Sequence, residues 1–305
     1  MELIKLQQAF WARMPLLLVL PYVLALGVGV VIEILATVYL PAARKPLYDS
    51  LEAYNQYQFF MATGMYCGVY LVLGTVQGFK TWLAQKIALL GREALMKTIT
   101  KTWIKSGAKT KVTNPDSRIN DDVRVATDGA LTVGIELTIS SFIVVGLTIG
   151  MMGQPLLLIS ALIYSLVSVG LALFFRSPLV NSRYSHLDAE GEHRAALTMI
   201  SVGQGDYTSK DKWETIKVTF TQYINVLRNY KYFGAMQTAI MIGAPFFILA
   251  PEYFNHQITL GDVMKGVSAF DLLVINAAVW VQLYPQITDI QTAFIRVKEF
   301  YYDIH

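Results

Sequence analysis

Residues 15–40, PLLLVLPYVLALGVGVVIEILATVYL, decide the fold, because Glu33 is the only charged side chain among them. An α-helix rises 1.5 Å per residue, so about 20 apolar residues cross the roughly 30 Å hydrocarbon core of a bilayer. The run is also too long for the apolar core of a secretion signal. It therefore predicts a helix that spans a membrane and stays in the mature chain.

Comparable apolar runs recur along the chain. We place the six spans at about 15–40, 59–79, 129–152, 154–175, 232–250 and 263–285. Of the 305 residues, 54% are hydrophobic and only 15% are charged, and the mean hydropathy is +0.43. Soluble domains carry roughly a quarter charged residues. The sequence predicts an all-α membrane protein with six transmembrane helices in a single transmembrane domain, 1–305.

The basic residues are distributed unevenly between these spans. Residues 80–128 carry ten Lys or Arg and residues 176–231 carry eight, whereas residues 251–262 carry none. Basic connections stay on the cytoplasmic side, which predicts that both basic segments and both termini are cytoplasmic. Apolar side chains at 3–4 spacing indicate that these segments are long helical extensions of the spans. Their excess charge favours contact with anionic membrane lipids and not with nucleic acid.

The polar stretch NPDSRINDD, residues 114–122, separates the second and third spans. Asn114 or Asp116 can cap a helix that starts near residue 117, and Pro115 stops any helix upstream. Acidic residues in a first turn are favoured by the helix dipole. We interpret the stretch as a cytoplasmic elbow whose motif residues are Asn114, Pro115, Asp116, Arg118, Asp121 and Asp122.

Four stretches, in order, resemble the membrane domain of subfamily D ABC transporters and their bacterial relatives. They are the segment 32–60 around Glu33, NPDSRINDD itself, AEGEHRAAL at 189–197, and the segment 258–300. NPDSRINDD resembles the family's NPDQRI-acidic motif. The resemblance implies an ABC-exporter-like transmembrane domain in a domain-swapped homodimer. In ATP-driven members of the family the elbow passes motion between the ATPase and the membrane helices.

No G-x-x-x-x-G-K-[ST] phosphate loop occurs in the sequence, so no nucleotide-binding domain is expected. The chain is therefore similar to the SbmA/BacA branch, which keeps the membrane domain without an ATPase. That resemblance implies a proton-driven homodimer in a bacterial inner membrane that imports peptides or similar bulky solutes. It implies no enzyme activity, no cofactor and no metal.

Two alternatives stay open. The NPD motif is closer to that of the ATP-driven relatives, so the chain could be the membrane subunit of an ABC transporter with a separate ATPase, and ATP would enter only through that subunit. The segment 203–214 departs from the family pattern. A structural subunit that reuses the transporter fold in a larger membrane complex therefore also remains possible.

Three acidic residues lie inside predicted spans: Glu33, Glu136 and Asp271. A charge in the bilayer core costs several kcal/mol, so such residues are functional candidates, and we propose them for proton coupling. None has a Lys or Arg near its depth in its own span. The sequence therefore predicts an acidic cavity, or acids that are kept neutral by burial.

Polar side chains also recur at helical spacing within the spans. At 100° per residue, Asp271, Gln282 and Asp289 share one face of the last span. The candidate cavity-lining residues are Tyr66, Tyr70, Gln77, Tyr164, Gln282 and Asp289. The alternative is that their hydroxyl and amide groups only bond neighbouring helices.

The predicted orientation can be tested by labelling single introduced cysteines with a membrane-impermeant thiol reagent. Ser209→Cys, in a basic segment, should react only from the cytoplasmic side. Asn255→Cys, in the connection without Lys or Arg, should react only from the opposite side. The reverse pattern would contradict the orientation, because it would place the basic segments outside.

Overall fold

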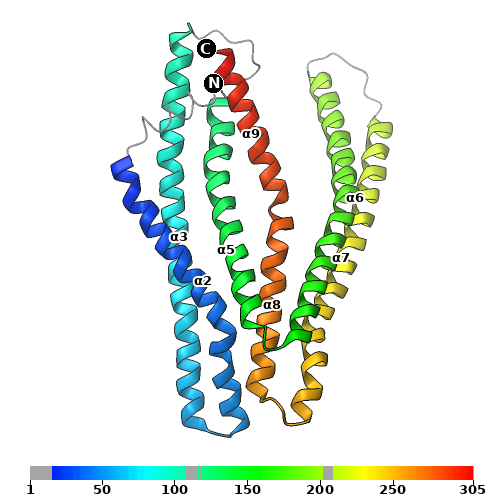
Figure 1. Ribbon diagram of the computed structural model, residues 1–305. Coiled ribbons are helices and arrows are strands. Elements are labelled where there is room, and N and C mark those ends of the chain that lie inside the picture. Colours follow the sequence, from blue (N-terminus) through cyan, green and yellow to red (C-terminus); the bar gives the residue numbers. More distant parts are fainter. Residues whose placement is uncertain (1–15, 108–115, 117, 202–208, 305) are drawn as a thin grey trace. The chain divides into compact units, whose positions relative to one another are not determined.

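The computed structural model describes residues 16–107, 116, 118–201 and 209–304, and every regular element in these ranges is a helix (Figure 1). The α-helices are α2 (Leu16–Glu52), α3 (Gln56–Lys105), α5 (Ala130–Gly150), α6 (Pro155–Ser201), α7 (Ser209–Phe254), α8 (Leu260–Gln282) and α9 (Tyr284–Asp303). Two π-helical turns, η1 (Arg118–Asp122) and η2 (Val125–Gly129), precede α5. Six candidate spans are long and apolar enough to cross a membrane, which confirms the predicted fold class.

Several helices run well beyond the thickness of a bilayer. The helix α3 has 50 residues, α6 has 47 and α7 has 46. At 1.5 Å per residue these lengths correspond to roughly 70–75 Å, more than twice the hydrocarbon core. The predicted helical extensions are therefore present. The helix α3 ends just before Gly107, whose φ of 78° is the left-handed conformation that glycine adopts without strain.

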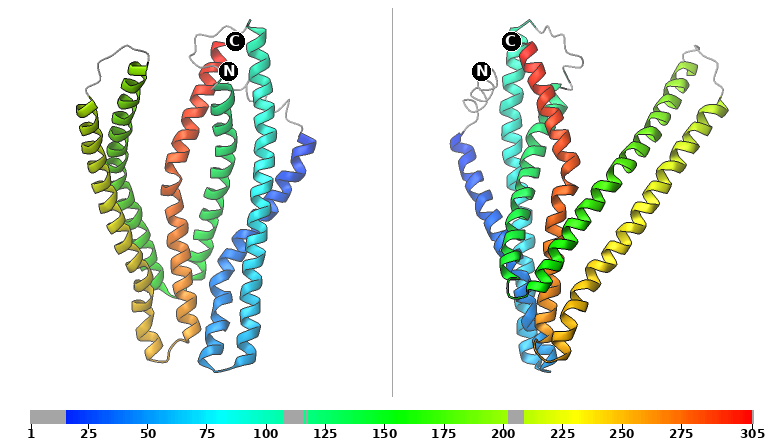
Figure 2. Two further views of the ribbon diagram at one scale, coloured as in Figure 1. Left: turned by 180° about the vertical axis from the view of Figure 1, so that it is seen from behind. Right: turned by 45° about the vertical axis from the view of Figure 1, so that its right-hand side comes forward.

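The chain divides into two compact units, residues 1–158 with 249–305, and residues 159–248. In the second unit α6 and α7 run alongside each other (Figure 2). The Tyr164 hydroxyl donates to the backbone oxygen of Gln237 at 2.6 Å, and the Gln237 amide donates to Ser168. These are bonds between neighbouring helices, the alternative explanation for the polar stripe of the fourth span.

In the first unit, the connection between α2 and α3 differs from the prediction. We expected residues 41–58 to leave the helix, but α2 continues to Glu52 and contains Pro41 and Pro46. Only residues 53–55 form the turn. Proline removes one backbone donor, and transmembrane helices tolerate it because neighbouring groups can satisfy the freed carbonyl. We call this end of the unit, where α8 also begins, the turn end, and the opposite end, where α3 and α9 finish, the basic end (Figure 1).

A set of polar contacts joins α2 to the start of α8 at the turn end. The backbone N–H of Gly261 donates to Asp49 Oδ1 at 3.0 Å, and that of Leu260 donates to Glu52 Oε2 at 2.8 Å. The Lys45 amine pairs with Asp262 Oδ1 at 2.6 Å. The first N–H groups of a helix have no partner within it and carry partial positive charge, so carboxylates stabilise them. We call these contacts the α2–α8 clamp.

Glycine allows close helix approach in the same unit. A Cβ on Gly146 of α5 would lie 2.7 Å from Val38 Cγ2 of α2, closer than side chains tolerate. Inside a bilayer, lipid tails are as apolar as the side chains, so helices associate through close packing by small residues and through polar bonds. The α2–α5 contact follows this rule.

The basic end is held instead by a hydrophobic core. It joins α3, the segment between η1 and η2, and α9, and its buried residues are Leu95, Ile99, Val123, Val297, Phe300, Tyr301 and Ile304. Ile99, Val123 and Phe300 are completely enclosed. Burying such a side chain away from water contributes about 1.5–3 kcal/mol. Hydrophobic burial stabilises a structure only where water surrounds it. A hydrophobic core is therefore expected at an end that projects from the membrane.

Replacing Gly261 with alanine should break the α2–α8 clamp. The new Cβ would lie 2.2 Å from Asp49 Oδ1 and 2.5 Å from the Lys45 backbone oxygen. Overpacking of this kind typically costs about 1–3 kcal/mol. We expect a lower melting temperature in detergent for Gly261→Ala. Gly64→Ala in α3, where the added Cβ meets nothing within 4 Å, is the matched control, and equal melting of both variants would contradict the clamp.

Candidate functional site

Three charged side chains from three helices meet inside the first unit. The Lys80 amine of α3 lies 2.9 Å from Glu33 Oε2 of α2 and 3.2 Å from Glu136 Oε1 of α5. The Gln77 side-chain amide donates to Glu33 Oε1 at 3.1 Å. We call Glu33, Lys80 and Glu136 the triad.

The two carboxylates of the triad differ in exposure. The side chains of Glu33 and Lys80 are each only 7% exposed, whereas that of Glu136 is 44% exposed. Lys80 and Glu33 thus form an enclosed ion pair, and Glu136 closes it from the open side. A paired buried charge is far less costly than an isolated one.

The triad corrects our expectation that the acidic residues lack a basic partner. We assigned Lys80 to the cytoplasmic basic segment because it follows the second apolar run directly. In the structure its amine turns back into the helix bundle and reaches both carboxylates. Periodicity along one helix cannot reveal this contact, because its partners lie on other helices. One signal in the sequence could have predicted the contact. Lys80 stands alone at the edge of the second apolar run, and the first and third spans each contain a single Glu.

Helix length indicates how far Glu33 lies from the turn end. Glu33 precedes the end of α2 at Glu52 by 19 residues. At 1.5 Å per residue this places it about 28 Å from the turn end, near the far side of a roughly 30 Å core. All three residues fall within helices that can cross a membrane.

An apolar cluster lies on the basic side of the triad. It joins α2 and α3, and its buried residues are Val19, Leu26, Leu83, Ala84 and Ile87. Partly buried Leu131 and Ile135 of α5 pack against it, directly before Glu136 in the chain. We call this set the apolar seal. Water and ions are disfavoured in such a cluster, so it separates the triad from the basic end.

Asp271, the third acidic candidate, does not join the triad. Its Oδ1 is buried and forms no hydrogen bond to the part of the chain that the structure describes. Arg44 of α2 is close enough to act electrostatically on its carboxyl group. The structure therefore brings together two of the three predicted proton-coupling residues.

The predicted polar stripes are arranged differently on the individual helices. On α3 the hydroxyls of Tyr66 and Tyr70 lie 3.3 Å apart, and Gln77, further along the same face, reaches Glu33. Asp271 and Gln282 both lie on α8, 11 residues apart, which at 100° per residue keeps them on one face. Asp289 lies on the next helix, α9, which begins at Tyr284 with Pro at its first turn.

The elbow is attached to α9 of the same chain. Buried Asp122 pairs with Arg296 Nε at 3.0 Å. Arg118 donates to the Arg296 backbone oxygen at 3.0 Å and to Glu299 Oε2 at 3.3 Å. The remaining motif residues are Asp116 and Asp121, both exposed, and Asn114 and Pro115, which lie outside the described residues. The elbow thus fixes the start of α5 to α9.

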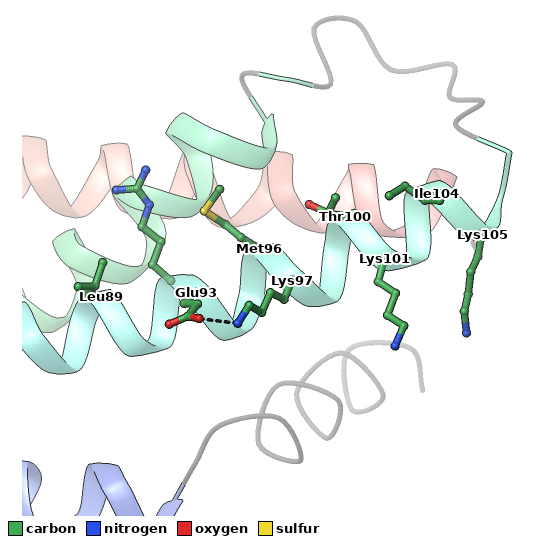
Figure 3. A pocket seen from close by; sticks show the side chains of 9 residues that line it. Leu89, Glu93, Met96, Lys97, Thr100, Lys101, Ile104 and Lys105 are labelled. Carbon is green, nitrogen blue, oxygen red and sulfur yellow. Dashed lines mark hydrogen bonds and ion pairs between the residues drawn. The ribbon is translucent and has the colours of Figure 1, made fainter.

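Two cavities lie away from the triad. One of about 1050 Å³ lies along the basic end of α3, where Lys97, Lys101 and Lys105 surround apolar Met96 and Ile104 (Figure 3). The other, of about 490 Å³, lies between α6 and α7 and is lined by aromatic and charged side chains. Within the described ranges, no group of three or more potential metal ligands comes together. Neither cavity is lined by a residue of the triad.

Replacing Lys80 with methionine should destabilise the protein strongly. The variant leaves two carboxylates without a cation, and breaking a buried ion pair costs about 3–5 kcal/mol. Lys97→Met is the matched control, because the pair of Lys97 with Glu93 is exposed and such pairs contribute about 0–1 kcal/mol. Thermal unfolding in detergent measures both. A Lys80→Met protein that melts like the parent would show that the triad is not a stabilising contact.

Comparison with known proteins identifies the family. Residues 17–202 match the family described as ABC transporter transmembrane region 2. An uncharacterized ABC transporter ATP-binding protein of Haemophilus influenzae is 22% identical over 72% of this chain and 42% of its own length. The inner membrane ABC transporter ATP-binding protein YddA of Escherichia coli is 21% identical over 73% and 46%.

ABC transporter D family member 2, chloroplastic, of Arabidopsis thaliana is 23% identical over 66% of this chain and 30% of its own length. The chain thus spans less than half the length of these curated relatives. The family match covers more than half of the chain itself, including α2, α3, the elbow and α5. The chain belongs to the ABC transporter transmembrane region 2 family.

Proposed function

We propose that this protein is a secondary transporter of the SbmA/BacA type that imports peptides or similar bulky solutes and is driven by proton entry. The observation that supports proton coupling is the triad, in which two carboxylates and one amine meet from three helices that are each long and apolar enough to cross a membrane. Ionisable residues at such positions are rare, because they are costly, and they mark ion and proton pathways. In this proposal, the protein is a carrier and not an enzyme.

The exposure of Glu136 supports the proposal of a homodimer. Its side chain is 44% exposed in a single chain although it lies in a membrane span. A carboxylate facing lipid is unfavourable, so this surface requires a partner or a water-filled cavity. A second copy of the chain would be such a partner, and the two copies together would enclose a water-filled cavity. A bacterial inner membrane is the proposed location, in keeping with the name of the Escherichia coli relative.

A second candidate is favoured by the comparisons. Two of the relatives are named as ABC transporter ATP-binding proteins, and the third as an ABC transporter. The chain would then be the membrane part of an ABC transporter, and an ATPase would act on it through the elbow. The rigid attachment of the elbow to α9 by Arg118 and Asp122 is compatible with such a role.

Transport by reconstituted protein separates the two candidates. Proteoliposomes are supplied with fluorescently labelled short peptides and a proton gradient, acidic outside, without nucleotide. We expect accumulation that a protonophore abolishes, because proton entry provides the free energy. Protein-free liposomes are the control. Absence of gradient-driven uptake, with uptake appearing only when ATP and an ATPase subunit are added, would reject the first candidate in favour of the second.

A further inference from the structure

The triad has unequal numbers of positive and negative groups. With all three side chains ionised, two carboxylates face one amine, and the net charge is −1. A net charge in a poorly solvated site is costly, whereas a neutral, hydrogen-bonded set is much less so. One proton bound to either carboxylate makes the triad neutral. The site is therefore suited to hold a single proton.

The two carboxylates are not equivalent acceptors for this proton. Glu33 is enclosed, and its two oxygens already face the Lys80 amine and the Gln77 side-chain amide. Glu136 meets the amine at a longer distance, 3.2 Å against 2.9 Å, and is the exposed member. A proton can reach Glu136 without opening the enclosed pair.

Few other charged groups face Glu136. The neighbouring helices α2 and α3 contribute Glu33 and Lys80. Residues 272–282 of α8, which packs on α2 and α5, include no ionisable side chain. Asp128 of η2 lies eight residues before Glu136, about 12 Å along the helix, and accepts a bond from the Thr127 hydroxyl. Among the described residues, Lys80 and Glu33 are therefore the charged groups that lie nearest to Glu136.

The surroundings also give the site a direction. The apolar seal closes the triad toward the basic end. Toward the turn end, the face of α3 continues as a polar stripe from Gln77 to the paired hydroxyls of Tyr70 and Tyr66. Water and protons are stabilised along polar groups and disfavoured in the apolar seal. The triad thus has polar side chains of α3 on its turn-end side and the apolar seal on its basic side.

From this geometry we infer that Glu136 is the residue that takes up and releases one proton per chain, from the turn end, while Lys80, held by Glu33, is its positioning partner. The inference deepens the proposed function and rests on it for its role in transport. It selects Glu136 from the three predicted proton-coupling residues, because Glu33 belongs to the enclosed ion pair and Asp271 lies outside the triad.

The step is a simple proton transfer. A proton from the aqueous phase binds the Glu136 carboxylate and forms a carboxylic acid, and the net charge of the triad changes from −1 to 0. The Lys80 ammonium keeps its proton and stays with Glu33, but it loses the ionic attraction to Glu136. The link between α3 and α5 is weakened as a result. Release on the other side requires a second conformation in which the apolar seal is open.

Infrared difference spectroscopy of the full chain in liposomes tests the assignment without requiring transport. Spectra at neutral and acidic pH reveal the carbonyl stretch of carboxylic acids that become protonated. We expect Glu136→Gln to lose one band that the parent shows and Glu33→Gln to keep it. Asp271→Asn and the surface variant Glu93→Gln are the controls for other carboxyl groups. A band that persists in Glu136→Gln and disappears in Glu33→Gln would overturn the inference.

A conservative variant keeps the test decisive if Glu33→Gln fails to fold. Glu136→Asp retains a carboxyl group, so it should retain the band at a changed frequency. A band that is identical in the parent, Glu136→Asp and Glu136→Gln rejects Glu136. The outcome is independent of the proposed function. If the parent shows no gradient-driven uptake but Glu136→Gln loses the band, the transport proposal fails and the proton site stands.

The direction of access is measured with an impermeant thiol reagent in a Cys67→Ala background. Gln77→Cys should react from the side that labels Gln56→Cys at the turn end, and not from the side that labels Lys105→Cys at the basic end. We expect the polar stripe to admit water from the turn end and the apolar seal to exclude water from the basic end. Reaction from the Lys105 side only, or from neither side, would overturn access from the turn end.

Discussion

The arrangement of α2, α3 and α5 depends on one amine, that of Lys80, placed between the carboxylates of Glu33 and Glu136. Water is absent from the core of a bilayer, so each of these groups must find its partner within the protein. An ionised Glu33 without Lys80 would cost several kcal/mol in its enclosed position. The three helices are therefore held in one register by charge, and no helix can slide along the others without separating an ion pair.

Away from the triad, other forces hold the helices of the first unit together. At the basic end, Val123 and Phe300 are fully buried in a hydrophobic core, and Asp122 pairs with Arg296 beside it. Near the opposite end of α5, Gly146 permits close contact with Val38 of α2. The segment from the elbow through α5 is thus fixed at three heights, by hydrophobic burial, by the triad and by close packing. Of these three attachments, the triad is the one for which we propose a response to a proton.

Both proposed energy sources act on this segment. Protonation of Glu136 weakens its attraction to Lys80, whereas an ATPase would act at the elbow, where Arg118 and Asp122 attach it to α9. In a membrane domain with both features, force can be applied to α5 either at the triad or at the elbow. This provides a physical reason why one family architecture, the ABC transporter transmembrane region, is compatible with two kinds of coupling.

The sequence by itself determined the six spans, the long helical extensions and the elbow, because span length and apolar periodicity are local properties of the chain. It also identified Glu33 and Glu136 as unusual, since each is a lone acid in an apolar run. Only the tertiary structure decided that Lys80 is their common partner and that Asp271 stands apart from them. It also decided that Pro41 and Pro46 remain helical and that α8 breaks at Leu283. These features depend on contacts between helices, and the periodicity of a single helix contains no information about which neighbour it meets.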